Sequence, residues 1–246
     1  MLDINPYILP INQESVANIS SAIAIAKEAE QLGVRKIIAT PRNVEGKQET
    51  ITTLVSRLNQ ELSDQGVNVE LIPAQTIRLY GEIEKDLTSN SILTFSDDPV
   101  YLFVELAQEH TPEYTRQLCY DLQLKGYQPI FVHPEKNLNI QQDNDLLYSL
   151  VKNGGLVQIS AASLSGKEGK KVQRLAKDFV KHNLVHFIGS DSREAKSYHL
   201  TDGWKVVRKL NKWQTLQDNM NLFINRKAVR GEEPMRVKKT KILGIF

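Results

Sequence analysis

The chain has 246 residues, 41% of them hydrophobic, enough for one large α/β domain or two small ones around a sizeable core. Its 31 Lys and Arg residues against 29 Asp and Glu residues leave a net charge of +2, so the overall charge predicts no binding to nucleic acid. Cys119 is the only cysteine, which excludes an intramolecular disulfide and favours a reducing compartment.

The first residues lack a basic stretch followed by an apolar run, so they do not resemble a secretory signal. No apolar stretch approaches the roughly 18–20 residues that span a bilayer. We therefore expect a cytoplasmic protein.

Short apolar runs rich in β-branched residues recur along the chain and predict seven strands. They are residues 2–4, 35–40, 69–74, 101–106, 129–133, 156–160 and 185–190. The segments between them have helical spacing, and they predict helices over 16–33, 48–65, 112–126, 143–152, 169–182 and 203–211. In the first of these helices, Gly33 stands where a C-cap glycine belongs. In the helix over 112–126, Leu118, Leu122 and Leu124 form the expected apolar face.

The strand starts are spaced by roughly 30 residues, the length of one βα unit. Strands that alternate with helices indicate a parallel sheet, and continuous apolar runs indicate strands covered on both faces. No Gly-rich phosphate-binding turn follows the first strand, so we favour a closed (β/α) barrel over an open sheet.

In such barrels the functional side chains lie at the carboxyl ends of the strands. The residues at these ends are polar, which is unusual at the end of an apolar strand. They are Asn5, Tyr7, Thr40, Pro41, Arg42, Gln75, Thr76, Glu105, His133, Ser160, Ser190, Asp191 and Arg193.

Around these positions the chain resembles the polymerase and histidinol phosphatase (PHP) family. It is most similar to the manganese-dependent protein tyrosine phosphatases that Gram-positive bacteria encode with capsule and exopolysaccharide genes. The resemblance runs from end to end, through IIATPR (37–42), YGEIEKDL (80–87), YDLQLKGYQPIFVHPEKN (120–137), QISAASLSGKEGKK (158–171) and LVHFIGSDSR (184–193). It implies a distorted, PHP-like (β/α)7 barrel with three metal ions, usually manganese, whose bridging hydroxide attacks the phosphate of phosphotyrosine.

The resemblance also implies which positions hold metal, and it assigns three surviving ligands, Glu105, His133 and Asp191. Five other ligand positions carry different residues in this chain. They are Asn5 and Tyr7 in place of the histidines of DIHxH, Arg42 in place of the histidine of TPH, Thr76 in place of a glutamate, and Arg193 in place of the histidine of SDxH.

These replacements weaken metal binding for a chemical reason. Asn and Thr are weak neutral donors, and Tyr would have to lose a proton whose pKa is about 10. Arg42 and Arg193 place permanent cations where metal ions would lie. We therefore expect manganese to be absent or weakly bound, and the chain to be a catalytically impaired pseudophosphatase. Two alternatives stay open: an active phosphatase with a reduced metal site, or a non-catalytic subunit in the oligomer of an active paralogue.

The two arginines have two possible roles. They can form ion pairs with the remaining carboxylates, or they can point outward and bind a phosphate group. The resemblance further implies a partner, the tyrosine kinase of the polysaccharide operon with its tyrosine-rich tail. Assembly into a homo-oligomer, or with a paralogue, is a further possibility.

The domain boundary is expected near residue 227, with a PHP-like barrel over 1–227 and a tail over 228–246. The tail carries Arg236 and three lysines, followed by an apolar end. One interpretation is a solvated tail. The other is an element that contacts either the anionic inner face of the membrane or a neighbouring chain of an oligomer.

Overall fold

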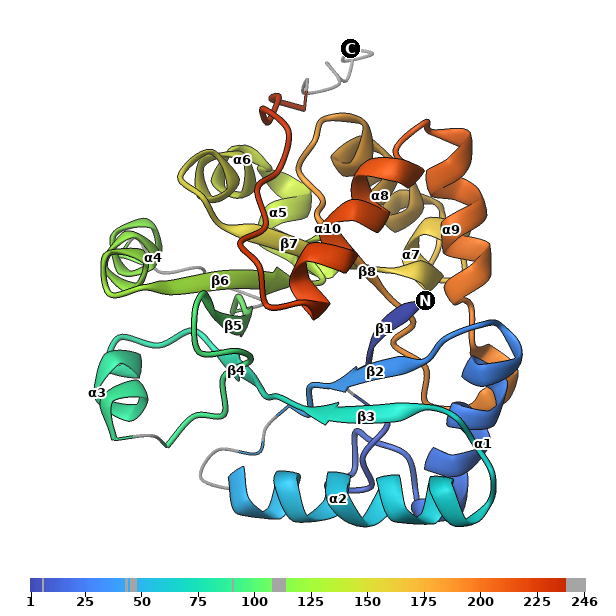
Figure 1. Cartoon of the computed structure of the whole chain (residues 1–246). Coiled ribbons are helices and arrows are strands. Elements are labelled where there is room, and N and C mark those ends of the chain that lie inside the picture. The colour runs from blue at the N-terminus through green and yellow to red at the C-terminus, as the bar shows by residue number, and fades with distance from the viewer. Residues whose placement is uncertain (6, 43, 45–47, 90, 108–113, 238–246) are drawn as a thin grey trace.

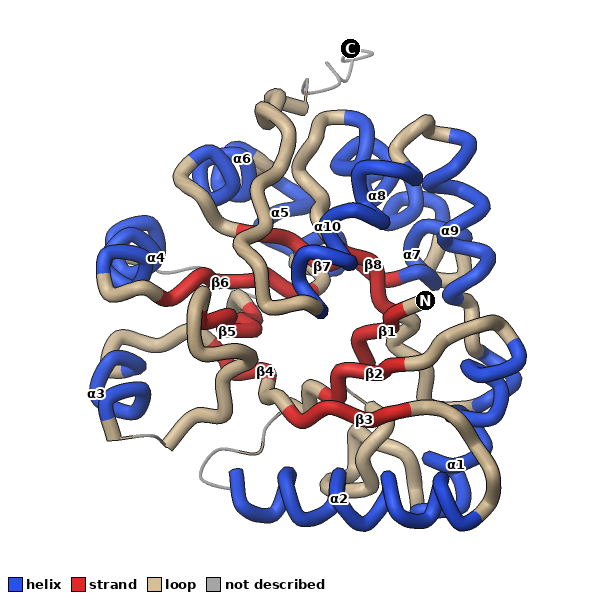
Figure 2. The backbone as a smooth tube through the Cα atoms, in the orientation of Figure 1, coloured by secondary structure: helices blue, strands red, loops and turns tan. Residues whose placement is uncertain are grey.

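The computed structural model describes residues 1–5, 7–42, 44, 48–89, 91–107 and 114–237. Within these residues, eight strands run parallel and curve around a common centre, with most helices outside the ring (Figures 1 and 2). The strands are β1 (Leu2–Asn5), β2 (Lys36–Ala39), β3 (Glu70–Pro73), β4 (Thr76–Arg78), β5 (Val100–Glu105), β6 (Tyr127–Val132), β7 (Leu156–Ser160) and β8 (Phe187–Gly189).

The ring is made of two hydrogen-bonded sheets, β1-β2-β3 and β4-β5-β6-β7-β8. On one side β8 lies beside β1, so closely that a Cβ added at Gly189 would come within 2.4 Å of the carbonyl oxygen of Ile4. On the other side the chain itself crosses from β3 to β4. This arrangement is a distorted barrel of parallel strands, as the sequence predicts.

The crossing from β3 to β4 corrects one prediction. Thr76 was expected at the end of a strand over 69–74, but it begins a separate strand, β4. The amides of Ala74 and Thr76 still donate to the carbonyl groups of Ala39 and Pro41, at 2.9 and 3.1 Å. Beyond this point the chain pairs with β5 instead, so the barrel has eight strands among the described residues and not seven.

Each helix predicted from periodicity is confirmed within the described residues, which leave out residues 112 and 113 of the helix predicted over 112–126, and four further helices are found there. The helices are α1 (Ile19–Gln31), α2 (Gln48–Asp64), α3 (Ile83–Thr88), α4 (Thr115–Leu124), α5 (Leu138–Gln142), α6 (Asp145–Lys152), α7 (Ala161–Ser165), α8 (Lys170–Lys181), α9 (Leu200–Lys209) and α10 (Trp213–Ile224). The prediction missed α3, α5, α7 and α10. It was also wrong for Leu124, which is 70% exposed because it lies two residues beyond Leu122 and so leaves the buried face.

Helix α10 packs against the amino end of the barrel. Its Phe223 is fully buried, and its ring centre lies 4.5 Å from that of Phe95, 4.9 Å from that of Tyr101 and 5.0 Å from that of Phe187. Tyr101 and Phe187 stand near the starts of β5 and β8. Aromatic contacts of this kind bury a large apolar area, so the amino end of the barrel is filled and the carboxyl end is left for polar groups.

The chain after α10 lies against the barrel at least as far as Val237 (Figure 1). The hydroxyl of Tyr101 donates to the carbonyl of Lys227 at 2.7 Å and accepts from the amide of Val229 at 3.1 Å. The amide of Met235 donates to the carbonyl of His182 at 2.8 Å. Residues 228–237, which the sequence assigns to the tail, therefore contact the barrel at several positions, such as the buried Val229, while most of their side chains are exposed. The lysines and the apolar end of the predicted tail, residues 238–246, lie outside the described residues. Among the described helices, none has the length and apolar character needed to cross a membrane.

Candidate functional site

Because the strands are parallel, their carboxyl ends meet at one end of the barrel, and the polar residues that follow them gather there. Asn5 and Glu105 are the last residues of β1 and β5, while His133 directly follows β6. Arg42 comes three residues after β2, and Asp191 two residues after β8. We call this region the barrel mouth.

Arg42 and Glu105 form an ion pair in the barrel mouth. The guanidinium Nε of Arg42 donates to one carboxylate oxygen of Glu105 at 3.1 Å, and a terminal nitrogen donates to the other oxygen. The remaining terminal nitrogen donates to the hydroxyl of Tyr7 at 3.0 Å. The two charged side chains are only 19% and 9% exposed. A two-point, charge-assisted contact of this kind is among the strong hydrogen-bonded pairs in proteins, and it occupies both oxygens of Glu105.

Tyr7 lies between the two arginines of the barrel mouth. While Arg42 donates to its hydroxyl, the guanidinium carbon of Arg193 stands 4.3 Å from the centre of its ring. This is a cation–π contact. Arg193 itself is exposed. Of the two arginines, Arg42 is thus paired with a carboxylate and Arg193 rests on an aromatic ring.

Asn5 and Thr76 are also buried. The side-chain amide of Asn5 donates to the carbonyl of Ser192 at 3.0 Å, and its side-chain oxygen accepts from the amide of Tyr7 at 2.8 Å. Both polar atoms of the Asn5 side chain are therefore hydrogen-bonded to backbone groups. The amide oxygen is a weak neutral donor, and one of its two lone pairs is already used by the amide of Tyr7.

His133, after β6, and Asp191, after β8, face each other in the barrel mouth. The Nδ1 atom of His133 lies 3.2 Å from one carboxylate oxygen of Asp191, but neither atom makes a hydrogen bond of acceptable geometry. Both residues have φ of +52°, a left-handed conformation that is uncommon for residues other than glycine and that concentrates at functional sites.

Burial controls the protonation of these two side chains. Burial first, and then the charges of Lys136 and Arg42, hold the pKa of His133 well below its ordinary value of 6.5. Burial also raises the pKa of Asp191 to about 7, although the charge of Lys136 opposes this change. Burial therefore favours the uncharged form of both side chains.

Two buried carboxylates near the barrel mouth were not predicted as site residues. Asp3 accepts hydrogen bonds from the amide and hydroxyl of Ser190, both at 2.7 Å, and from the hydroxyl of Tyr198 at 2.6 Å. Burial raises its pKa to about 6. Glu135 accepts from the amide of Ser160 at 3.0 Å, its other oxygen has no hydrogen bond, and burial raises its pKa. Asp3 could have been noticed in the sequence, because it is a charged residue between the apolar residues of a predicted strand.

The donors of the barrel mouth can be tested against the metal cluster that the resemblance implies. Among the described residues, no three His, Cys, Asp or Glu side chains are grouped so that they could hold a metal ion. The three predicted ligands are divided, since Glu105 is paired with Arg42 while His133 and Asp191 face each other. A guanidinium group has no lone pair to offer, and its charge repels a divalent cation. The donor set therefore does not fit a cluster of three manganese ions.

Comparison with known proteins finds a matching family model, similar sequences and similar solved structures. Residues 1–239 match the family model for capsular polysaccharide synthesis, CpsB/CapC. Tyrosine-protein phosphatase YwqE of Bacillus subtilis is 34% identical over the full length of both chains. A crystal structure of YwqE, reported with CpsB of Streptococcus pneumoniae as metal-dependent tyrosine phosphatases, aligns with a TM-score of 0.91 over 97% of this chain and 100% of that one.

A more distant structure supports the fold alone. Histidinol phosphate phosphatase of Lactococcus lactis is 14% identical and aligns with a TM-score of 0.54 over 85% of this chain and 93% of that one. Together with the YwqE structure, it confirms the predicted PHP-like barrel. The match to the family model and the identity with YwqE show that the chain belongs to the CpsB/CapC family of capsular polysaccharide synthesis.

Proposed function

We propose that this chain takes part in regulating capsular or exopolysaccharide synthesis as a phosphatase-family protein that does not hydrolyse phosphotyrosine efficiently. The proposal rests on one observation above all, the ion pair between Arg42 and Glu105 in the barrel mouth. Family membership supports the biological setting, because the matching family is one of capsular polysaccharide synthesis.

The ion pair opposes metal-dependent catalysis in two ways: Arg42 brings a positive charge to the barrel mouth, and it occupies both carboxylate oxygens of Glu105. A metal ion bound to Glu105 would have to displace Arg42 from both carboxylate oxygens, or lie beside a fixed positive charge at short range. Metal-dependent phosphate hydrolysis needs cations that activate water and hold the phosphate oxygens. Arg42 and Arg193 supply positive charge, but neither can generate hydroxide, because arginine stays protonated in proteins.

The proposed role is therefore recognition of a partner protein without efficient turnover, through contacts other than a phosphotyrosine in the barrel mouth, where Arg42 is already paired with Glu105. Relatives named as tyrosine-protein phosphatases suggest a tyrosine-containing protein segment as the partner. In this setting the tyrosine-rich tail of the operon kinase is the partner we propose. Contact of the C-terminal segment with a membrane surface and assembly with an active paralogue stay predictions. Copurification with an active paralogue would favour the role of a non-catalytic subunit.

A second candidate function, hydrolysis with a reduced metal site, draws on the contact between His133 and Asp191. An uncharged imidazole 3.2 Å from a carboxylate oxygen offers two donor groups, and because Mn²⁺ is the weakest binder in the Irving–Williams order, two such donors would hold it weakly. Two ligands leave most of the coordination sphere to water. The geometry thus supports weak binding of one ion better than a catalytic cluster.

The two candidates differ in a direct assay. We expect the purified chain, in excess manganese, to hydrolyse a phosphotyrosine peptide and p-nitrophenyl phosphate about 10³-fold more slowly than YwqE assayed beside it, a loss of the size that follows removal of electrostatic catalysis. Any residual rate should be the same in a His133→Gln/Asp191→Asn variant, which controls for contaminating phosphatase. Manganese-dependent turnover near that of YwqE, lost in this variant, would establish the second candidate instead.

A further inference from the structure

Helix α8 carries a concentration of positive charge on the outside of the barrel (Figure 1). Residues 167–181 contain six Lys and Arg residues and two acidic residues, a net charge of +4, whereas the whole chain has a net charge of only +2. The rest of the chain is therefore slightly negative. The net positive charge of the protein thus comes from the segment around this one helix.

Four of these cations form a straight row along α8. They stand at positions i, i+4, i+7 and i+11, which places them on one face of the helix, and we call this row the basic stripe. Its members are Lys170, Arg174, Lys177 and Lys181. The stripe is about 17 Å long, because a helix rises about 1.5 Å per residue. The side chain of Lys177 is half-buried and the other three are exposed. The buried residues of α8 lie on the opposite face, and they are Ala176, Phe179 and Val180.

The basic stripe has few acidic partners. In the described part of the chain, Lys181 lies 4.0 Å from Asp178, and the other three cations of the stripe make no ion pair. The nearby Glu168 is paired with Lys136 at 2.8 Å. Several exposed lysines elsewhere are matched with carboxylates: Lys36 with Glu70, Lys85 with Glu82, and Lys125 with Glu84. The stripe thus keeps its positive charge available to an anionic partner.

The exposed face of α8 lacks the apolar side chains of a protein–protein interface. Such interfaces have a buried apolar core with a few large anchoring side chains. Among the described residues, no exposed large hydrophobic side chain belongs to α8. A surface of lipid headgroups needs no such anchors, because electrostatic attraction to basic residues supplies the affinity. An anionic membrane surface therefore suits the stripe better than a protein partner.

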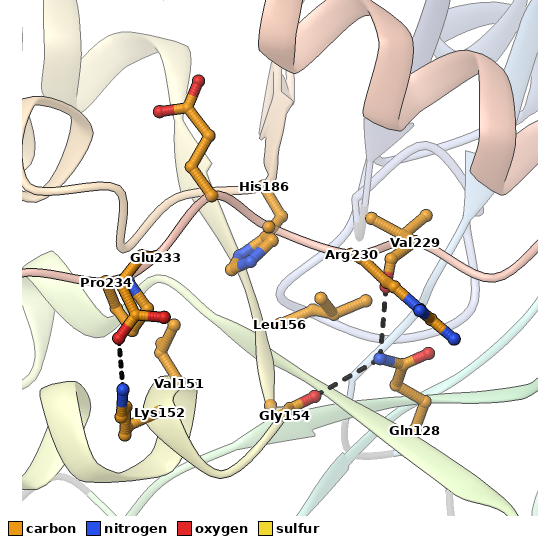
Figure 3. A pocket seen from close by; sticks show the side chains of 13 residues that line it. Gln128, Val151, Lys152, Gly154, Leu156, His186, Val229, Arg230, Glu233 and Pro234 are labelled. Atoms are coloured by element: carbon orange, nitrogen blue, oxygen red, sulfur yellow. Dashed lines mark hydrogen bonds and ion pairs between the residues drawn. The ribbon is translucent and has the colours of Figure 1, made fainter.

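The C-terminal segment reaches the end of the same helix. The amide of Met235 donates to the carbonyl of His182, the residue directly after α8, at 2.8 Å. Figure 3 shows this segment where Glu233 pairs with Lys152 of α6. In the sequence, residues 238–246 follow with three lysines and an apolar end. A second basic element thus continues from a point beside α8, and two such elements together strengthen attachment to a membrane.

We propose that the basic stripe of α8 binds an anionic membrane surface. The helix would lie along the surface with its four cations among the lipid headgroups, as clusters of about four to eight basic residues do. Because α8 lies outside the ring of strands, this contact leaves the barrel mouth open to a protein partner (Figure 1). The contact does not depend on whether the barrel mouth hydrolyses phosphotyrosine.

The test is cosedimentation of the full-length protein with vesicles of phosphatidylglycerol and phosphatidylcholine and, separately, with vesicles of phosphatidylcholine alone. We expect binding to the anionic vesicles only. Raising sodium chloride from about 0.1 M to 1 M should weaken this binding at least tenfold, because the Debye length falls from about 10 Å to about 3 Å.

A stripe variant and a matched control separate local charge from total charge. The stripe variant is Lys170→Gln, Arg174→Gln, Lys177→Gln and Lys181→Gln. It should bind anionic vesicles at least 100-fold more weakly, since each basic residue near such a surface adds about fivefold in affinity. The control removes the same charge from exposed lysines on other elements, through Lys27→Gln, Lys36→Gln, Lys85→Gln and Lys125→Gln. Its affinity should stay within about threefold of the parent, because distant charges are screened. Thermal melting followed by circular dichroism confirms that both variants are folded.

The proposal is overturned if the stripe variant binds the vesicles as tightly as the parent, which would leave the C-terminal tail as the membrane-binding element. It is also overturned if the control variant loses as much binding as the stripe variant, or if neutral vesicles bind as well as anionic ones. A polyglutamate peptide is the second probe. Its binding to the parent, without binding of the parent to anionic vesicles, would assign the stripe to an acidic protein segment and contradict the proposal.

Discussion

Replacing Arg42 with alanine is expected to lower the free energy of unfolding by about 2–4 kcal/mol. Removing one partner of a fully buried ion pair costs about 3–5 kcal/mol, because the other charge is left buried and unpaired, and the slight exposure of this pair places it toward the lower end. Glu105 would lose both of its hydrogen bonds from the guanidinium, and Tyr7 would lose the donor to its hydroxyl. Urea denaturation of parent and variant measures the difference.

Two further variants show whether the effect belongs to the pair. Arg57→Ala removes an exposed arginine from α2 and should change stability by less than about 0.5 kcal/mol. Arg42→Ala combined with Glu105→Gln should lose less than Arg42→Ala alone, because no unpaired charge remains. If the single and the double variants are equally unstable, the loss comes from packing and the ion pair is not its cause.

The same variant separates the two roles considered for the arginines. With Arg42 directed at Glu105, a phosphotyrosine peptide should bind neither the parent nor Arg42→Ala in a calorimetric titration. If Arg42 instead serves as a phosphate reader, the substitution should leave stability nearly intact and abolish peptide binding. A stable Arg42→Ala protein from a parent that binds no phosphotyrosine would contradict both roles.

Restoring the implied metal ligands should succeed only when they are restored together. We expect Asn5→His with Tyr7→His to bind no more manganese than the parent, because Arg42 would still occupy both oxygens of Glu105. The full set should gain measurable manganese binding and some hydrolysis of p-nitrophenyl phosphate, because it removes two cations and adds five ligands. This set is Asn5→His, Tyr7→His, Arg42→His, Thr76→Glu and Arg193→His.

The informative comparison is between the manganese binding and the phosphatase activity of the double variant and those of the fivefold variant. The fivefold variant with Asp191→Asn added is the matched control, since it keeps the new histidines and removes one implied ligand. Strong phosphatase activity in the double variant alone would show that Arg42 and Arg193 do not prevent metal binding. That result would refute the idea that the two arginines exclude metal from the barrel mouth.

Much of the barrel could be predicted from the sequence, because its strands are covered on both faces and therefore read as continuous apolar runs. The run over 101–106, for example, corresponds to β5. Strand β4 was missed because it has three residues and follows Pro73 closely, so it has no apolar run of its own. Helix α10 was missed. The burial of its Phe223 depends on aromatic rings from β5 and β8, and these contacts between residues distant in sequence cannot be read from local spacing.

The candidate site was predicted as a set of positions, and ion pairs between its two arginines and the remaining carboxylates were one of the two roles considered for them. The rule that polar residues gather at strand ends placed Arg42 and Glu105 at the same end of the barrel. It did not show that Arg42 contacts Glu105 and Arg193 contacts Tyr7, because side-chain direction depends on local backbone and packing.

The manganese content of the purified full-length protein tests the central claim most directly. The protein would be incubated with excess manganese, passed through a desalting column and analysed by elemental mass spectrometry, with YwqE treated in the same way as the reference. Because Arg42 occupies Glu105 and the predicted ligands are divided, we expect well under one manganese ion per chain. Two or three tightly held ions per chain would contradict that claim.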